Sequence, residues 1–151
     1  MGKKQKGFSL IELLIVVAII LIIAAIAIPN LLRSKMAANE ASAVGSLRSL
    51  NTACITYSTT YGSYPTTLAS LGPAATASST TADLIDSVLA SGTKSGYTFT
   101  FTGGAGTTYS ITAIPVTVGT TGQRAFFTNQ SGVIRANTTG ASPTVTDPPI
   151  S

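Results

Sequence analysis

Few side chains in this sequence could do chemistry, and the first of them along the chain is Glu12. There are five carboxylates, one cysteine and no histidine, so the usual general base and commonest metal ligand is missing. Asp83 and Asp86 could form a catalytic carboxylate pair, but helix capping explains both more simply because no other reactive group accompanies them. Cys54 has no partner for a disulfide and no histidine to activate it, which favours a buried, inert thiol. We therefore expect no enzymatic activity, no catalytic residue, no cofactor and no metal site.

Glu12 lies at the threshold of an apolar run. Residues 13–28 are sixteen apolar residues without a break, and the stretch from Phe8 to Ile28 is 21 residues long. A helix of that length, at about 1.5 Å per residue, matches a hydrocarbon core of roughly 30 Å. Twelve of the sixteen are Leu, Ile or Val, and their summed preference for lipid outweighs the cost of about 3 kcal/mol for one central carboxylate. This segment is predicted to enter a membrane.

Two ordinary interpretations of this segment compete. A secretory signal would have its cleavage site at Ala25-Ile26-Ala27. The apolar stretch is long for such a signal, and Pro29 would be the second residue after the cleaved bond. A plain anchor explains the length, and the lysines at positions 3, 4 and 6 would hold the amino terminus in the cytoplasm. The anchor leaves Glu12 unexplained.

The segment KKQKGFSLIELLIVVAIILIIAAIAIP resembles the class III signal of type IV prepilins and pseudopilins. It contains a short basic leader ending in Gly7, then Phe8, a glutamate four residues further on, and Pro29. The resemblance implies that a membrane peptidase cuts between Gly7 and Phe8 and methylates the new Phe8 amine. It also implies that the apolar helix is kept, first as an anchor and then as the core of a helical filament.

The resemblance gives Glu12 a role in assembly. A carboxylate in hydrocarbon needs a partner or must be neutralised, and the cut at Gly7 creates an amine within one helical turn of it. In the family this glutamate attracts the amine of a neighbouring subunit and sets the register of assembly. The alternative is a Glu12 that extends to the lipid headgroups.

A helical period continues beyond Pro29 and predicts one helix from about Ser9 to about Tyr61. Its apolar positions follow spacings of three and four, and they are Met36, Ala43, Leu47, Leu50, Cys54, Tyr57 and Tyr61. The half at 30–61 is therefore amphipathic and should pack a globular domain. Pro29 should kink or loosen the helix because it removes a backbone hydrogen bond.

Beyond the helix, residues 62–96 are predicted as a loop with one short helix near 83–90, capped by Asp83. From Tyr97 the period becomes two, with aromatic residues on one face and threonines on the other. Four antiparallel strands are expected, near residues 97–102, 108–114, 124–128 and 132–136. The tail contains three prolines and is expected to be extended or loose.

The predicted fold class is α+β: a long N-terminal helix, with a transmembrane half and an amphipathic half, packed on a small four-stranded antiparallel sheet. A long helix followed by an antiparallel sheet is also the pilin fold. The expected divisions are a leader at 1–7, a transmembrane and filament-core helix at 8–29, an amphipathic half at 30–61, a loop with a short helix at 62–96, a sheet at 97–136 and a tail at 137–151.

Two features separate this chain from common members of the family. Many pilins close their carboxy-terminal region with a disulfide, which one cysteine cannot form. Major pseudopilins of type II secretion bind calcium there through acidic residues, yet only Asp147 follows Asp86, too few carboxylates for such a site. The stretch YGSYPTTLASLG, in contrast, resembles the segment that follows the helix in those pseudopilins.

The interpretation is a structural subunit of a type IV pilus, resembling a major pilin and serving adhesion, motility or DNA uptake. It would start in the inner membrane with a cytoplasmic amino terminus and a periplasmic domain, and end in an extracellular filament. Its expected partners are identical subunits, the prepilin peptidase and methyltransferase, the inner-membrane assembly machinery, minor pilins and, before assembly, lipid. From Phe8 onward the net charge is only +1, so no nucleic-acid site is expected.

Three alternatives stay open. The first is a pseudopilin of a type II secretion system. The second is a monomeric membrane-anchored binding domain whose leader is never cut. The third is electron transport along aromatic side chains, with Phe8, Tyr57, Tyr61 and Tyr64 as candidates, although these residues have the spacing of a packed core.

Overall fold

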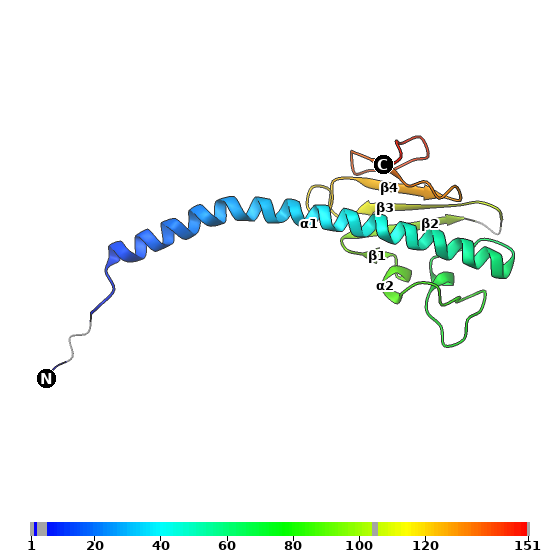
Figure 1. Ribbon diagram of the computed structural model, residues 1–151, viewed down its shortest axis with the longest axis horizontal. Helices are drawn as coiled ribbons and strands as arrows, with labels where there is room; N and C mark the ends of the chain where they lie inside the picture. Colours follow the sequence, from blue (N-terminus) through cyan, green and yellow to red (C-terminus); the bar gives the residue numbers. More distant parts are fainter. Residues whose placement is uncertain (1, 3–5, 104–105, 151) are drawn as a thin grey trace. The chain divides into compact units, whose positions relative to one another are not determined.

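The computed structural model describes residues 2, 6–103 and 106–150, and Lys3 and Lys4 of the predicted leader lie outside them. The described chain divides into two compact units, one ending at Ser34 and the other beginning at Lys35. The helices are α1 (Leu10–Tyr61), the short 3-10 helix η1 (Ala69–Leu71) and α2 (Ser87–Ala90) (Figure 1). The strands are β1 (Thr93–Lys94), β2 (Tyr97–Gly103), β3 (Tyr109–Pro115), β4 (Ala125–Asn129) and β5 (Arg135–Asn137).

Helix α1 begins and ends within a residue of its predicted bounds. The predicted apolar stripe is confirmed in the second unit, where it lies against the sheet. Its fully or nearly fully buried members are Ala43, Leu47, Leu50, Cys54 and Tyr57, while Met36 and Tyr61 are half-buried. This face of α1 is therefore one wall of the core.

The sheet has five antiparallel strands in the order β1-β2-β3-β4-β5, which confirms the α+β class and adds one strand to the predicted four. Along β2 the predicted alternation is present, with Tyr97 and Phe99 buried and the threonines that follow each of them exposed. The extra strand, β1, has only two residues and pairs with the start of β2 across a turn at Ser95 and Gly96. Two residues carry no periodicity, so sequence reasoning had no signal for it.

The short helix differs from its prediction. It begins at Ser87 and not at Asp83, and its N-cap residue, Asp86, makes no capping hydrogen bond with its side chain. The residues before it are not helical because their backbone N–H groups bond to the segment around η1, and Asp83 itself has a left-handed φ of 53°. Ala82 donates to Ser70, and Leu84 and Ile85 both donate to Leu71.

The carboxy-terminal tail is more ordered than predicted. Ala136 of β5 donates a backbone hydrogen bond to Pro148, and Ile150 donates one to Ile134, so the end of the chain runs along the open edge of β5. An uncovered strand edge is a template for unwanted pairing, and prolines on the covering segment offer no further donors. The tail therefore closes this edge of the sheet.

Candidate functional site

The predicted cleavage bond lies in exposed, non-helical backbone. Gly7 and Phe8 precede α1, and the Phe8 side chain is 86% exposed. An added Cβ at Gly7 would meet no atom within 4 Å, and its backbone is not in the left-handed region. The described fold therefore gives no reason for a glycine at this position. Any requirement for it must come from a molecule that handles the chain.

Glu12 has a local partner that sequence reasoning missed. The backbone N–H of Ser9 donates to Oε2 of Glu12 at 2.9 Å, and the N–H of Leu13 donates to the Ser9 carbonyl at 3.2 Å. A serine at the N-cap and a glutamate three residues later form a capping box, here with its glutamate half in place. The Ser-x-x-Glu spacing was the available signal. Among the described residues, no hydrogen bond engages the other oxygen, Oε1.

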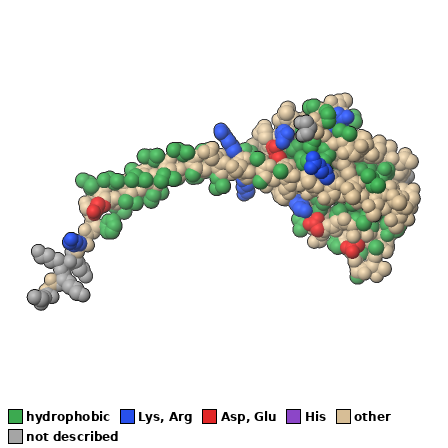
Figure 2. Space-filling model, in the orientation of Figure 1, with side chains coloured by type: hydrophobic (Ala, Val, Ile, Leu, Met, Phe, Trp, Pro, Cys, Tyr) green, Lys and Arg blue, Asp and Glu red, His purple; other side chains and the backbone are tan. Residues whose placement is uncertain are grey.

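The helix beyond Glu12 presents apolar side chains on all sides. The large apolar residues from Phe8 to Leu32 are each between 44% and 86% exposed in this unit, and Figure 2 shows this covering of hydrophobic side chains. By length and composition α1 is the one described helix that could cross a membrane, a test that a signal sequence also passes. So large an apolar surface needs lipid or protein to cover it.

Pro29 lies inside α1, and the helix is continuous through it. A proline has no N–H, so the carbonyl of Ala25 lacks the donor that closes a helical turn there. The peptide bonds among the described residues are all trans. A local weakness at this position remains a prediction.

Glu40 joins α1 to the segment that precedes β4. Its Oε1 accepts hydrogen bonds from the backbone N–H groups of Gln123 at 2.9 Å and Arg124 at 3.0 Å, and Oε2 pairs with the Arg124 side chain at 2.9 Å. Burial by itself would raise the pKa of Glu40, but the two backbone donors and the guanidinium together hold it below its ordinary value. This carboxylate is a structural clamp on the helix.

A buried polar network joins α1 to the sheet further along. The Asn51 amide donates to the Thr128 hydroxyl at 2.9 Å, and the Tyr109 hydroxyl donates to the Asn51 carbonyl at 2.9 Å. Burial also raises the pKa of the Cys54 thiol to about 12, so Cys54 is unreactive. The predicted burial of Cys54 is confirmed.

The remaining sequence candidates do not assemble into a reactive site. Asp83 contacts the Ala74 N–H at 3.4 Å, whereas Asp86 pairs with Lys94 at 3.6 Å. Within the part of the chain that the structure describes, no three His, Cys, Asp or Glu residues cluster as metal ligands would. Asp147 is occupied: its oxygens accept from Asn137 at 3.1 Å and from the Thr144 N–H at 2.6 Å.

Of the aromatic candidates for electron transport, the three tyrosines pack in or against the core, whereas Phe8 is exposed. Tyr57 and Tyr61 have ring centroids 4.7 Å apart, and Tyr64 lies 4.7 Å from Tyr109. Contacts of this kind are typical of a hydrophobic core. They explain the spacing of these tyrosines without a role in conduction.

Comparison with known proteins adds two kinds of match. Residues 2–28 match the family model described as the prokaryotic N-terminal methylation motif. The chain is 33% identical over 72 residues to a Type II secretion system core protein G of Dickeya chrysanthemi, covering 48% of this chain and 47% of the relative. It is 60% identical over 38 residues to the Type IV wide pilus major component PilA4 of Thermus thermophilus, covering 25% and 29%.

A third relative is the Type IV major pilin protein PilA of Myxococcus xanthus, 50% identical over 50 residues, which are 33% of this chain and 23% of that protein. The chain spans less than half the length of each of these relatives. The similarity is therefore strong over a limited segment, and it includes both secretion and pilus proteins.

Proposed function

We propose that this chain is a structural subunit of a type IV pilus. The proposal starts from the chain's membership of the type IV pilin and pseudopilin family. A membrane peptidase would cut the precursor between Gly7 and Phe8, and the new Phe8 amine would be methylated. The mature chain would then polymerise with its apolar helix inward. The subunit itself would carry no catalytic activity.

The observation that carries this proposal is the methylation motif at residues 2–28 on a helix whose large apolar side chains from Leu10 to Leu32 are exposed in the described part of the first unit. A motif match alone would fit any processed membrane protein. The exposed apolar helix must in addition be covered, by lipid before assembly and by other copies of the chain after it. The exposed, non-helical bond after Gly7 adds access for a peptidase.

The capping geometry suggests how Glu12 acts in assembly. One oxygen of its carboxylate accepts the Ser9 N–H at 2.9 Å, which fixes the side chain at the start of the helix. The other oxygen can accept a hydrogen bond from the amino-terminal ammonium group of a second copy. Such a charge-assisted bond in hydrocarbon is stronger than a bond between neutral groups. Two helices in the wrong register would leave this carboxylate unpaired, so the pair would select one register.

Cellular location and partners follow from the same proposal. The precursor would sit in the inner membrane with its amino terminus in the cytoplasm and its domain in the periplasm, and the filament would be extracellular. The partners would be identical subunits, the prepilin peptidase and methyltransferase, the inner-membrane assembly machinery and minor pilins.

A pseudopilin of a type II secretion system is the second candidate. Its support is the similarity to core protein G relatives over 64 to 72 residues, a longer stretch than in the pilus proteins compared above. The calcium site expected of major pseudopilins counts against this candidate. Asp147 is the one side-chain carboxylate in the tail, and its oxygens already accept hydrogen bonds from Asn137 and Thr144. A monomeric anchored binding domain is the third candidate, and it requires an uncut leader.

Electron microscopy with a labelled antibody against the domain, applied to the native host, tests the proposal. A pilus subunit gives long labelled surface filaments that disappear when the prepilin peptidase gene is deleted. A pseudopilin gives no long filaments at native expression, and its deletion blocks export of secreted enzymes. Label confined to the membrane in both strains would favour the anchored binding domain.

A further inference from the structure

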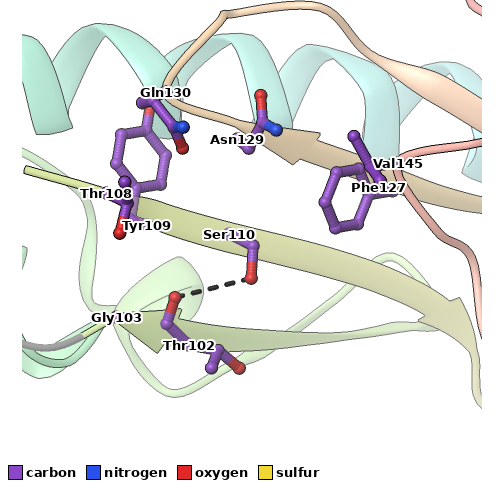
Figure 3. A pocket seen from close by; sticks show the side chains of 9 residues that line it. All are labelled: Thr102, Gly103, Thr108, Tyr109, Ser110, Phe127, Asn129, Gln130 and Val145. Carbon is purple, nitrogen blue, oxygen red and sulfur yellow. Dashed lines mark hydrogen bonds between the residues drawn. The ribbon is translucent and has the colours of Figure 1, made fainter.

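The face of the sheet that is turned away from α1 carries an open pocket of about 500 Å³. It lies over the ends of β2, β3 and β4, with α1 behind the strands, and Figure 3 labels the residues that line it. None of these residues is charged. The volume lies within the range of about 300–1,000 Å³ that is typical of small-ligand sites.

Phe127 of β4 and Val145 of the tail supply apolar side chains to this pocket (Figure 3). The preceding residue of β4, Phe126, faces α1 and is fully buried, so the alternation of the strand turns Phe127 to the outer face, where it is half-buried. Its cross-strand partners are Thr112 of β3 and Arg135 of β5, and β2 continues the row beyond Thr112 with Thr100. The ring of Phe127 therefore has hydroxyl groups on one side and Arg135 on the other, and Arg135 donates to the Asp147 carbonyl at 2.8 Å and is not among the residues that line the pocket.

Two amide side chains line the pocket, those of Asn129 and Gln130, and both can form further hydrogen bonds. The carbonyl oxygen of Asn129 accepts from both the backbone N–H and the hydroxyl of Ser131, at 3.0 and 2.7 Å, which fixes the direction of its amide nitrogen. Among the described residues, no hydrogen bond engages that nitrogen or the exposed side chain of Gln130. The hydroxyl of Thr102, at the opposite side of the pocket, is likewise unbonded within the described ranges (Figure 3).

We propose that this pocket binds a neutral saccharide of one or two rings. The C–H face of a sugar ring would lie against Phe127, and its hydroxyls would bond to the amides of Asn129 and Gln130 and to Thr102. An anionic ligand would find no cation in the lining, and a purely apolar ligand would leave three polar groups without partners. A sugar offers both an apolar face and neutral hydroxyls. Binding at this pocket does not require polymerisation.

Ligand-observed saturation-transfer NMR tests this on the full chain in micelles of a phosphocholine detergent, which has no sugar headgroup. The probes are maltotriose, mannotriose and triacetylchitotriose, with trigalacturonate as the charged comparison. Two variants change the pocket: Phe127→Leu keeps apolar volume but removes the ring, and Gln130→Ala removes an exposed amide. Gln123→Ala is the matched control, because Gln123 is exposed and lies outside the pocket.

The expected result is saturable binding of at least one neutral trisaccharide. Phe127→Leu and Gln130→Ala should each weaken it about fivefold, as expected for loss of one stacking or hydrogen-bonding contact, and Gln123→Ala should leave it unchanged. The proposal is overturned if no neutral trisaccharide binds at millimolar concentration, if trigalacturonate binds best, or if the control loses as much as the pocket variants. If Phe127→Leu lowers filament yield while no sugar binds, the saccharide proposal is overturned in favour of a contact between copies of the chain.

Discussion

Loss of the Glu40 carboxylate should loosen the globular domain by a predictable amount. The Glu40 side chain is 12% exposed and accepts three hydrogen bonds, two from backbone N–H groups and one from Arg124. At about 1 kcal/mol net for each, Glu40→Ala should cost roughly 3 kcal/mol. Glu40→Gln keeps the oxygen that serves both backbone donors and loses the ion pair. Because Arg124 is 44% exposed, that loss should be only about 1 kcal/mol or less.

The same clamp should make stability depend on pH. The pKa of Glu40 is lower in the folded chain than in the unfolded chain, so the folded state favours the ionised form. Its contribution is therefore fully present above the unfolded value of about 4.3 and is lost as the pH falls through the folded value. Urea titrations of the full chain in phosphocholine micelles, at pH 7 and at pH 3, measure this. Glu40→Gln should remove this part of the acid-dependent loss.

Asp86→Asn is the matched control for these titrations. It removes a carboxylate from a pair with Lys94 that is 3.6 Å apart and largely exposed, so it should change stability by less than about 0.5 kcal/mol. The clamp role of Glu40 would be refuted if Glu40→Ala unfolded at the same urea concentration as the unmodified chain, or if Asp86→Asn cost as much.

Three further predictions concern processing, assembly and the core. Gly7→Val should leave an uncut, membrane-bound precursor, since a branched side chain obstructs the cleavage site. If that variant had the mass of the cut chain, the proposed signal would be contradicted. Glu12→Leu should be processed normally, while the yield of sheared filaments falls about tenfold or more through loss of a charge-assisted contact; unchanged yield would refute a register role. Asn51→Ala leaves the buried Tyr109 hydroxyl without its acceptor and removes one of the two hydrogen bonds of Thr128, which still donates to Val133, and it should cost about 2–4 kcal/mol in urea titrations. Ser49→Ala, on the exposed face of α1, should cost less than about 0.5 kcal/mol, and equal costs would count against the network.

Strong periodicity made much of this fold predictable. The spacings of three and four from Ala43 to Tyr57 predicted the buried face of α1, and YTFTFT predicted the two faces of β2. Both patterns extend over several residues, and both reflect the burial of apolar surface, which drives folding more strongly than any other favourable interaction.

Other parts of the fold depend on contacts that no local pattern encodes. Asn51 is a polar residue on the buried side of α1. Its hydrogen-bond partners Thr128 and Tyr109 are 77 and 58 residues away in the sequence. The tail is extended along β5, which is one of the two predicted states, and the hydrogen bonds that hold it there are long-range contacts that its prolines did not reveal. The short helix starts at Ser87 because the backbone N–H groups of residues 82–85 bond to residues 70–72 and not within a helix.

The candidate site was predicted from a motif and not from periodicity. Gly7, Phe8 and Glu12 were identified by their positions relative to the apolar run, and the structure adds the bond from Ser9 to Glu12. Phe127, in contrast, was hidden in the dipeptide Phe126-Phe127, where only the pairing of β4 shows which ring faces outward.

Intact mass with amino-terminal sequencing, applied to membranes and to the sheared surface fraction of the native host, tests the central claim most directly. A filament subunit gives a chain in the sheared fraction that begins at Phe8 and carries one added methyl group. A chain that still carries Lys3, Lys4 and Lys6 in every fraction, or one that begins at Ile28, would contradict both the processing at Gly7 and the assembly role of Glu12.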